Sequence, residues 1–255
     1  MQYFVSGDSG ASSQGLLPFG LVIALACLSS FGGMTRFLFP DEPSVERLVE
    51  YQSQKLFESA KNPISLRAAT LYVHSITEHC QGRQLELWES WPQWLLGQFY
   101  SPLLRTQNPL WIVSGGRGDC SERSAVLQDL LACQGIPSRF VGLGGHVVLE
   151  AKSDEKTWIL DPDYGLSIQS GLEELLGQGE GELAAWLVDQ GIVPSKSLEY
   201  ERMVRTVQDN VALDWNQPLS PRLKSIESLC ELGVWIVPLL CWLGIGWNIL
   251  PGNRR

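Results

Sequence analysis

The first informative feature of this sequence is the set of motifs that it lacks. Among its 255 residues there is no glycine-rich phosphate loop, no dinucleotide-binding fingerprint and no C-x-x-C pair. These absences argue against a nucleotide cofactor, a zinc ribbon and a thioredoxin-like redox site. The six cysteines are too few for a disulfide scaffold in a chain of this length. We therefore expect a protein that needs no cofactor and no metal ion.

Clustered positive charge is also missing. The net charge is -9, and no group of Lys or Arg residues gathers anywhere in the chain. Nucleic-acid-binding domains usually carry a basic stripe that follows the phosphates. The sequence therefore predicts no nucleic-acid partner.

Two long segments contain no charged residue at all. Residues 16–35 are apolar enough, and long enough, to span a bilayer. The second segment, residues 232–251, carries Trp235, Trp242 and Trp247, and tryptophan favours the membrane interface. The pattern predicts two transmembrane helices and hence a lipid bilayer as a partner.

Each segment has an alternative interpretation. A cleaved signal peptide is the alternative for the first, although no Lys or Arg precedes it, and export signals begin with positive charge. A buried core helix is the alternative for the second. Arg36 and Arg47 favour a cytoplasmic central domain, whereas Arg254 and Arg255 favour the opposite side. Because the first span usually dominates, we expect an integral membrane protein whose domain faces the cytoplasm.

The rest of the chain divides into three parts. Residues 1–15 form a short tail, and residues 41–165 mix helical and strand patterns in one domain. Residues 166–229 return to helical spacing and carry no motif with recognisable chemistry. This extension is expected to dock the domain against the spans or to cover its site.

Cys120 is the first candidate for chemistry. Residues 115–118 read as a glycine-rich loop, and residues 121–133 have helical spacing, so Cys120 falls at a helix N-terminus. The free N–H groups and the helix dipole favour a thiolate there, and they are also able to stabilise an oxyanion. Arg117 adds positive charge, whereas Asp119 opposes it.

His146 and Asp161 are the second and third candidates, and they lie on two strands expected to form a hairpin. With Ser153 and Asp154 at the centre of the turn, His146 lies opposite Asp161. A turn longer by two residues places Asp163 opposite His146 instead, so Asp163 is the reserve candidate.

Taken singly, each candidate has an ordinary structural interpretation. A free cysteine is often a small buried apolar side chain. A single histidine is often a structural one, and an aspartate before proline often ends a strand. Their order in one short segment favours a catalytic group, in which an imidazole takes the thiol proton and a carboxylate orients the ring.

Several short motifs in this segment resemble the core of the transglutaminase-like superfamily, over residues 66–165. They are Gly118-Asp119-Cys120 with the helix after it, Gly135-Ile136-Pro137-Ser138-Arg139, His146, Trp158 and Leu160-Asp161-Pro162. The resemblance implies an α+β, papain-like fold with the nucleophile at a helix N-terminus, packed on an antiparallel sheet that carries His and Asp. It implies Cys120 as nucleophile, His146 as general base and acid, and Asp161 as the residue that orients the imidazole.

The chain departs from the family pattern at one position, and the motifs do not identify the oxyanion donor. The family commonly has an aromatic residue two positions after the histidine, where this chain has Val148. An oxyanion donor upstream of the nucleophile is not identified by the motif, and Trp111 and Gln107 are the candidates.

Together these features predict an α+β fold with a transglutaminase-like or papain-like core, flanked by two transmembrane helices. The expected function is that of a membrane-anchored cysteine enzyme that forms a thioester from an amide of a protein or peptide. Transfer to water makes a peptidase or amidase, and transfer to an amine makes a transglutaminase-type enzyme. The alternative is a non-catalytic module that binds a peptide or organises a membrane complex.

Overall fold

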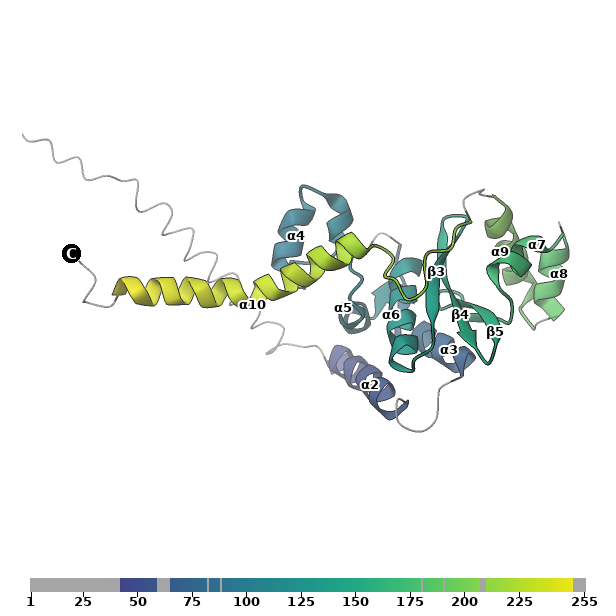
Figure 1. The fold of residues 1–255 in the computed structure, drawn as a ribbon, viewed down its shortest axis with the longest axis horizontal. Coiled ribbons are helices and arrows are strands. Elements are labelled where there is room, and N and C mark those ends of the chain that lie inside the picture. The colour runs from purple at the N-terminus through teal and green to yellow at the C-terminus, as the bar shows by residue number, and fades with distance from the viewer. Residues whose placement is uncertain are drawn as a thin grey trace, which may run out of the picture.

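The structure is a computed structural model, and it shows a mixed α+β domain (Figure 1). It describes residues 42–58, 65–81, 83–87, 89–179, 181–189, 191–206 and 210–249. The predicted N-terminal tail, 1–15, and the first predicted span, 16–35, lie outside these ranges.

Among the described residues, helices predominate in the first half of the chain, and in the second half four strands precede four helices. The first half contains α2 Glu42–Glu58, α3 Leu66–Ile76, β1 Glu78–His79, α4 Trp91–Gly97, the 3-10 helix η2 Ser101–Leu104, α5 Pro109–Gly115, β2 Arg117–Gly118 and α6 Cys120–Cys133. The second half contains β3 Ser138–Leu143, β4 His146–Ser153, β5 Lys156–Asp161, β6 Leu166–Ile168, α7 Leu172–Gly177, α8 Glu182–Asp189, α9 Pro194–Thr206 and α10 Pro221–Ile249.

The central element is a four-stranded antiparallel sheet in the order β3-β4-β5-β6. A second, two-stranded sheet pairs β1 with β2 in parallel. The β4–β5 hairpin turns through Asp154 and Glu155, whose φ angles of 52° and 60° are both left-handed. Such a pair of residues matches the tight turn that suits the twist of a hairpin. The register is therefore set by Ser153 opposite Lys156.

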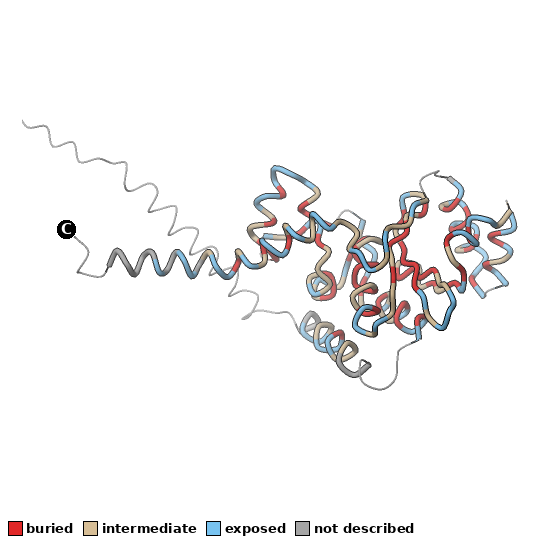
Figure 2. The backbone as a smooth tube through the Cα atoms, in the orientation of Figure 1, coloured by how far each residue is buried: buried red, intermediate tan, exposed pale blue. Residues whose placement is uncertain are grey.

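Each face of this sheet has its own apolar core. On one face, Leu127 and Leu131 of α6 pack with Phe140 and Leu149. On the other face, Val148 packs beneath α7, α8 and α9. This follows from the alternation of side chains along a strand. Figure 2 shows the buried strands running through the middle of the domain, between helices in which buried and exposed stretches alternate.

Residues 211–216 cover the outer edge of β3. The amide of Gly142 donates to the Val211 carbonyl at 2.8 Å, and the Leu213 amide donates to the Phe140 carbonyl at 2.9 Å. An open strand edge invites pairing with other chains. The predicted extension at 166–229 thus supplies β6, the fourth strand of the sheet, and it also contains α7–α9, this edge segment and the start of α10.

Helix α10 corrects the prediction of a second transmembrane span at 232–251. None of the helices in the described ranges combines the length and the apolar character needed to cross a bilayer. The apolar run continues a helix that starts at Pro221 and whose first half lies beside α4 (Figure 1). Within the run Val234 is only 3% exposed, whereas Leu232 and Leu239 are more than half exposed. The expected fold class is therefore wrong in its flanking span, and the predicted integral-membrane localisation is overturned with it.

Charged side chains explain how α10 is held. Glu227 accepts hydrogen bonds from the Thr106 hydroxyl and from the Gln107 amide, the latter at 3.2 Å. Glu231, four residues later, accepts from the Asn108 side chain and from the indole N–H of Trp111. These contacts attach the first half of α10 to the segment that leads into α5.

Gly144 lies in the β3–β4 turn, and we predict that Gly144→Ala destabilises the fold strongly. Its φ is +58°, and a Cβ atom there would overlap the carbonyl oxygen of Met203 in α9. Backbone strain and this clash together should lower the free energy of unfolding by at least about 3 kcal/mol, measured by urea denaturation. Gly135→Ala is the matched control, because its φ is +70° but nothing lies within 4 Å. It should lose only about 1 kcal/mol. Equal losses in the two variants would contradict the predicted clash.

Candidate active site

Cys120 is the first residue of α6, and a capping box fixes the backbone around it. The Asp119 carboxylate accepts from the amides of Ser121 at 2.9 Å and Glu122 at 3.0 Å. In return, the Glu122 carboxylate accepts from the Asp119 amide at 3.1 Å. Within the described residues, the backbone N–H of Cys120 is the one N–H group in the first turn of α6 that has no acceptor. That amide is therefore available to an oxyanion formed at the thiol.

Glu122 is a buried carboxylate two residues after Cys120. Burial raises its pKa, and although Arg83 lies 3.6 Å away and opposes this, the pKa reaches about 7. The spacing Asp119-x-x-Glu122 is a capping-box signature. The sequence therefore contained a local signal for this contact.

His146 and Asp161 lie in contact at the ends of β4 and β5. His146 Nε2 and Asp161 Oδ2 are 2.8 Å apart, and Asp161 is fully buried. The register that predicted this pair is nevertheless wrong, because Leu149 lies opposite Leu160 and the turn is centred one residue later than expected. His146 and Asp161 are diagonal neighbours on one face, and diagonal neighbours remain within reach of long side chains.

The reserve candidate, Asp163, is directed elsewhere. Asp161 Oδ1 accepts from the amides of Asp163 at 2.9 Å and Tyr164 at 3.1 Å, which turns the chain away from β4. Asp163 Oδ1 instead contacts Arg123 NH1 at 2.6 Å and His79 Nδ1 at 2.9 Å. The structure therefore pairs His146 with Asp161 and leaves Asp163 for another histidine.

The thiol of Cys120 is the second partner of His146. Asp161 occupies Nε2, which leaves Nδ1 as the ring nitrogen able to face the thiol. Burial alone would lower the pKa of His146, but hydrogen bonds to Asp161 and Cys120, together with their negative charges, raise this pKa to about 10. The three predicted site residues thus meet in one place, as a thiol, an imidazole and a carboxylate in series.

Two tyrosines enclose the His–Asp pair. The ring of Tyr164 meets the His146 ring edge to face, with centroids 5.4 Å apart. Tyr200 of α9 is fully buried, and burial, followed by the charge of nearby Asp161, raises the pKa of its hydroxyl. These rings keep water from the pair and strengthen the electrostatic attraction within it.

Arg123 lies one turn after Cys120 in α6 and is only 1% exposed. Its Nε donates to Thr77 Oγ1 at 2.9 Å, and its NH2 donates to the carbonyls of Thr77 at 2.7 Å and His74 at 3.0 Å. NH1 contacts Asp163 Oδ1, as described above. Arg123 therefore joins α6 to the end of α3 and to the turn after Asp161.

All the histidines of the chain meet at this turn. The sequence contains three, and each contacts a different one of three consecutive residues. His146 contacts Asp161, His74 Nδ1 lies 3.0 Å from the Pro162 carbonyl, and His79 contacts Asp163. Sequence reasoning identified His146 alone, since no local spacing connects His74, His79 or Arg123 to the turn.

The upstream residues proposed as oxyanion donors have other partners. The side-chain amide of Gln107 donates to the Ser220 carbonyl at 3.5 Å and accepts from the Ser220 backbone N–H at 3.3 Å. The Trp111 indole contacts Glu231. Both therefore hold the start of α10. Val148 is fully buried in the core beneath α7–α9, so it forms no part of a surface groove.

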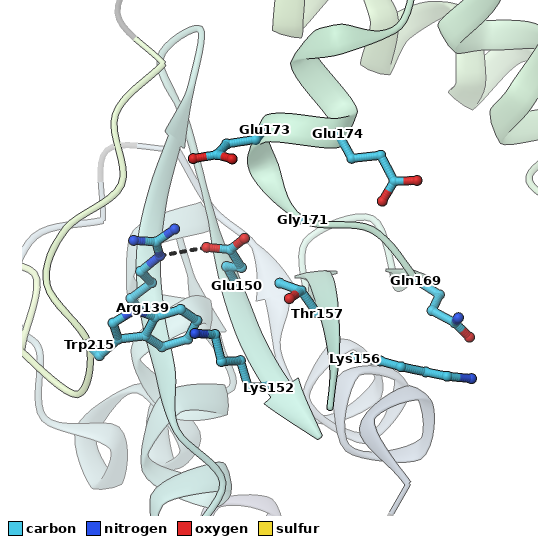
Figure 3. Close-up of a pocket in the computed structure, with 10 residues that line it drawn as sticks. All are labelled: Arg139, Glu150, Lys152, Lys156, Thr157, Gln169, Gly171, Glu173, Glu174 and Trp215. Atoms are coloured by element: carbon cyan, nitrogen blue, oxygen red, sulfur yellow. Dashed lines mark hydrogen bonds and ion pairs between the residues drawn. The ribbon is translucent and has the colours of Figure 1, made fainter. Parts of the chain in front are cut away.

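A pocket of about 610 Å³ is lined by Glu150 and Lys152 of β4 (Figure 3). Both lie an even number of residues after His146, which places them on the same face of the sheet, towards the other end of the strand. Arg139 and Glu150 form an ion pair of 2.5 Å on its floor, and the Trp215 ring lies beneath Arg139 and Lys152. Glu150 also accepts from the Leu172 amide at 3.0 Å. The pocket is thus built from paired charges that hold α7 and the edge segment, and it is separate from Cys120.

Metal binding and known relatives give no further assignment. Among the described residues, no group of three or more His, Cys, Asp or Glu side chains is arranged to hold a metal ion. No protein-family model matches the chain, and no curated protein matches it significantly.

We predict that Arg123→Met lowers the free energy of unfolding by about 3–5 kcal/mol, because it leaves Asp163 buried without its strongest counter-charge. Urea denaturation measures the change. Arg105→Met is the control: Arg105 contacts Asp119 at 3.1 Å, but its side chain is 59% exposed, so the loss should stay within about 1 kcal/mol. A loss as small in Arg123→Met would show that the buried contacts do not hold the site together.

Proposed function

We propose that this protein is a cysteine acyl-transfer enzyme, which attacks an amide of a protein or peptide through Cys120 and forms a thioester. The observation that carries the proposal is the serial contact of Cys120, His146 and Asp161 at one end of the sheet. The sequence resemblance to the transglutaminase-like superfamily supports the same chemistry.

In the first half-reaction, the Cys120 sulfur attacks the amide carbon. The Cys120 amide is placed to donate to the oxygen that becomes negative. His146 gives its proton to the leaving nitrogen, the C–N bond breaks, and the acyl group stays on sulfur as a thioester. A protonated His146 favours the thiolate before the attack, in keeping with its raised pKa.

In the second half-reaction, an acceptor attacks the thioester carbon and the C–S bond breaks. Water as acceptor gives hydrolysis, and a primary amine gives transfer. The choice depends on which acceptor reaches the thioester first. Asp161 acts by orienting the His146 ring, because its other oxygen is held by two backbone amides.

We predict that iodoacetamide labels Cys120 faster than Cys133 near neutral pH, although Cys133 is exposed and Cys120 only partly so. The reason is that protonated His146 stabilises the Cys120 thiolate. The advantage should shrink as the pH rises towards about 10, where His146 loses its proton and ordinary thiols are ionised. Mass spectrometry of the labelled peptides measures both rates.

His146→Ala is the matched variant for this experiment and should remove the advantage of Cys120. Labelling that simply follows exposure, with Cys133 ahead of Cys120 in the unchanged protein, would contradict an activated thiol. That result would favour a non-catalytic module that binds a peptide.

We also predict that Asp161→Asn lowers turnover of p-nitrophenyl acetate at Cys120 by about 10³-fold while the fold survives. An asparagine loses the negative charge that stabilises the imidazolium. If its oxygen accepts the two turn amides, it also presents N–H, in place of an acceptor, to His146. Turnover and thermal unfolding of the purified variant are measured together. Unchanged turnover in a folded variant would remove Asp161 from the mechanism.

A further inference from the structure

His79 lies beside the strand that delivers the nucleophile. It ends β1, and it pairs with Gly118 of β2 in the parallel two-stranded sheet. The next amide, that of Cys80, donates to the Gly118 carbonyl at 3.0 Å. Neighbouring strands lie about 5 Å apart, and Cys120 follows Gly118 by two residues. The backbone of His79 is therefore a close neighbour of the segment that leads into the nucleophile.

The ring of His79 is held by the same turn that holds His146. Its Nδ1 lies 2.9 Å from Asp163 Oδ1, and the Asp163 amide donates to Asp161 Oδ1 at 2.9 Å. One turn thus carries two His–Asp pairs, and a backbone hydrogen bond couples their carboxylates.

The two pairs differ in their access to solvent. The side chain of His146 is 9% exposed, and its two ring nitrogens face Asp161 and Cys120. The side chain of His79 is 51% exposed. In the described part of the chain, its Nε2 has no hydrogen-bond partner. The free nitrogen of His79 is therefore open to solvent.

A simple charge-balancing role does not account for His79. Arg123 already lies 2.6 Å from the Asp163 carboxylate and is itself buried, so the negative charge of Asp163 has a partner without an imidazolium. Anchored through Nδ1, the His79 ring presents Nε2 to solvent.

We propose that His79 is a second acid–base residue of this site, serving the acceptor in the second half-reaction; the inference rests on the proposed function. As water attacks the acyl-Cys120 carbon, its proton passes to His79 Nε2. The C–S bond then breaks, the electron pair returns to sulfur as the Cys120 thiolate beside His146, and the acyl group leaves as a carboxylic acid. His79 afterwards releases its proton to solvent, and His146 takes up from solvent the proton that it gave to the leaving nitrogen. An amine acceptor loses its proton by the same path.

The test separates formation of the acyl-enzyme from its breakdown. The full-length chain is mixed with p-nitrophenyl acetate, and mass spectrometry follows the acetyl group on the Cys120 peptide. His79→Gln should acetylate Cys120 at the rate of the unchanged protein, but the acetyl group should persist about a hundredfold longer. In His79→Ala, added imidazole should restore the breakdown, because the exposed position leaves room for it.

Glu78→Gln provides the matched control, since Glu78 is an exposed neighbour on the same strand. Its acetyl-enzyme should break down normally. Normal breakdown in His79→Gln would overturn the role of His79 and leave the proposed function intact. Failure of the unchanged protein to acetylate Cys120 would overturn both. Slow breakdown that imidazole does not restore would show that His79 acts on structure alone, and would also overturn the proposal.

Discussion

The buried guanidinium of Arg123 is the interaction on which the site depends. A protein core accepts a cation only when its charge is offset and its N–H groups find acceptors. Asp163 supplies the opposite charge, and the end of α3 supplies a hydroxyl and carbonyl oxygens. Because Arg123 lies one turn after Cys120, these contacts also fix the position of the thiol relative to the turn after β5. The spacing between the Cys120 thiol and the Asp161 carboxylate is therefore a consequence of core packing.

Asp161 is the second fixed point, and it relies on the first. Its oxygens accept two turn amides and contact one imidazole, which compensates the carboxylate for the water lost on full burial. Tyr164 and Tyr200 enclose it from the side of α9. A carboxylate held at both oxygens cannot rotate freely, so it holds the His146 ring in one plane. The ring sits at the very start of β4, where a side chain can reach past the sheet edge to α6.

Features encoded by neighbouring residues could be predicted from the sequence, and features encoded by distant ones could not. The helix start at Cys120 and the β4–β5 hairpin follow from local patterns, but a shift of one residue in the turn centre changed the pairing. The contacts of Asp163 with Arg123 and His79 join residues 40 and 84 positions apart. The composition of residues 232–251 alone predicts a membrane span. The glutamates in the first half of α10, however, attach this helix to the domain through distant residues.

The turn after β5 explains why two aspartates separated by a single residue contact different histidines. Pro162 separates them and has no N–H to donate, so the amides that reach Asp161 are those of Asp163 and Tyr164. Closing the turn on Asp161 directs the Asp163 side chain towards α6 and β1, where Arg123 and His79 receive it. The His146–Asp161 pair is thus enclosed by aromatic rings, whereas the His79–Asp163 pair has its histidine open to solvent. Burial, and not residue type, distinguishes the imidazole that contacts the thiol from the one that is open to solvent.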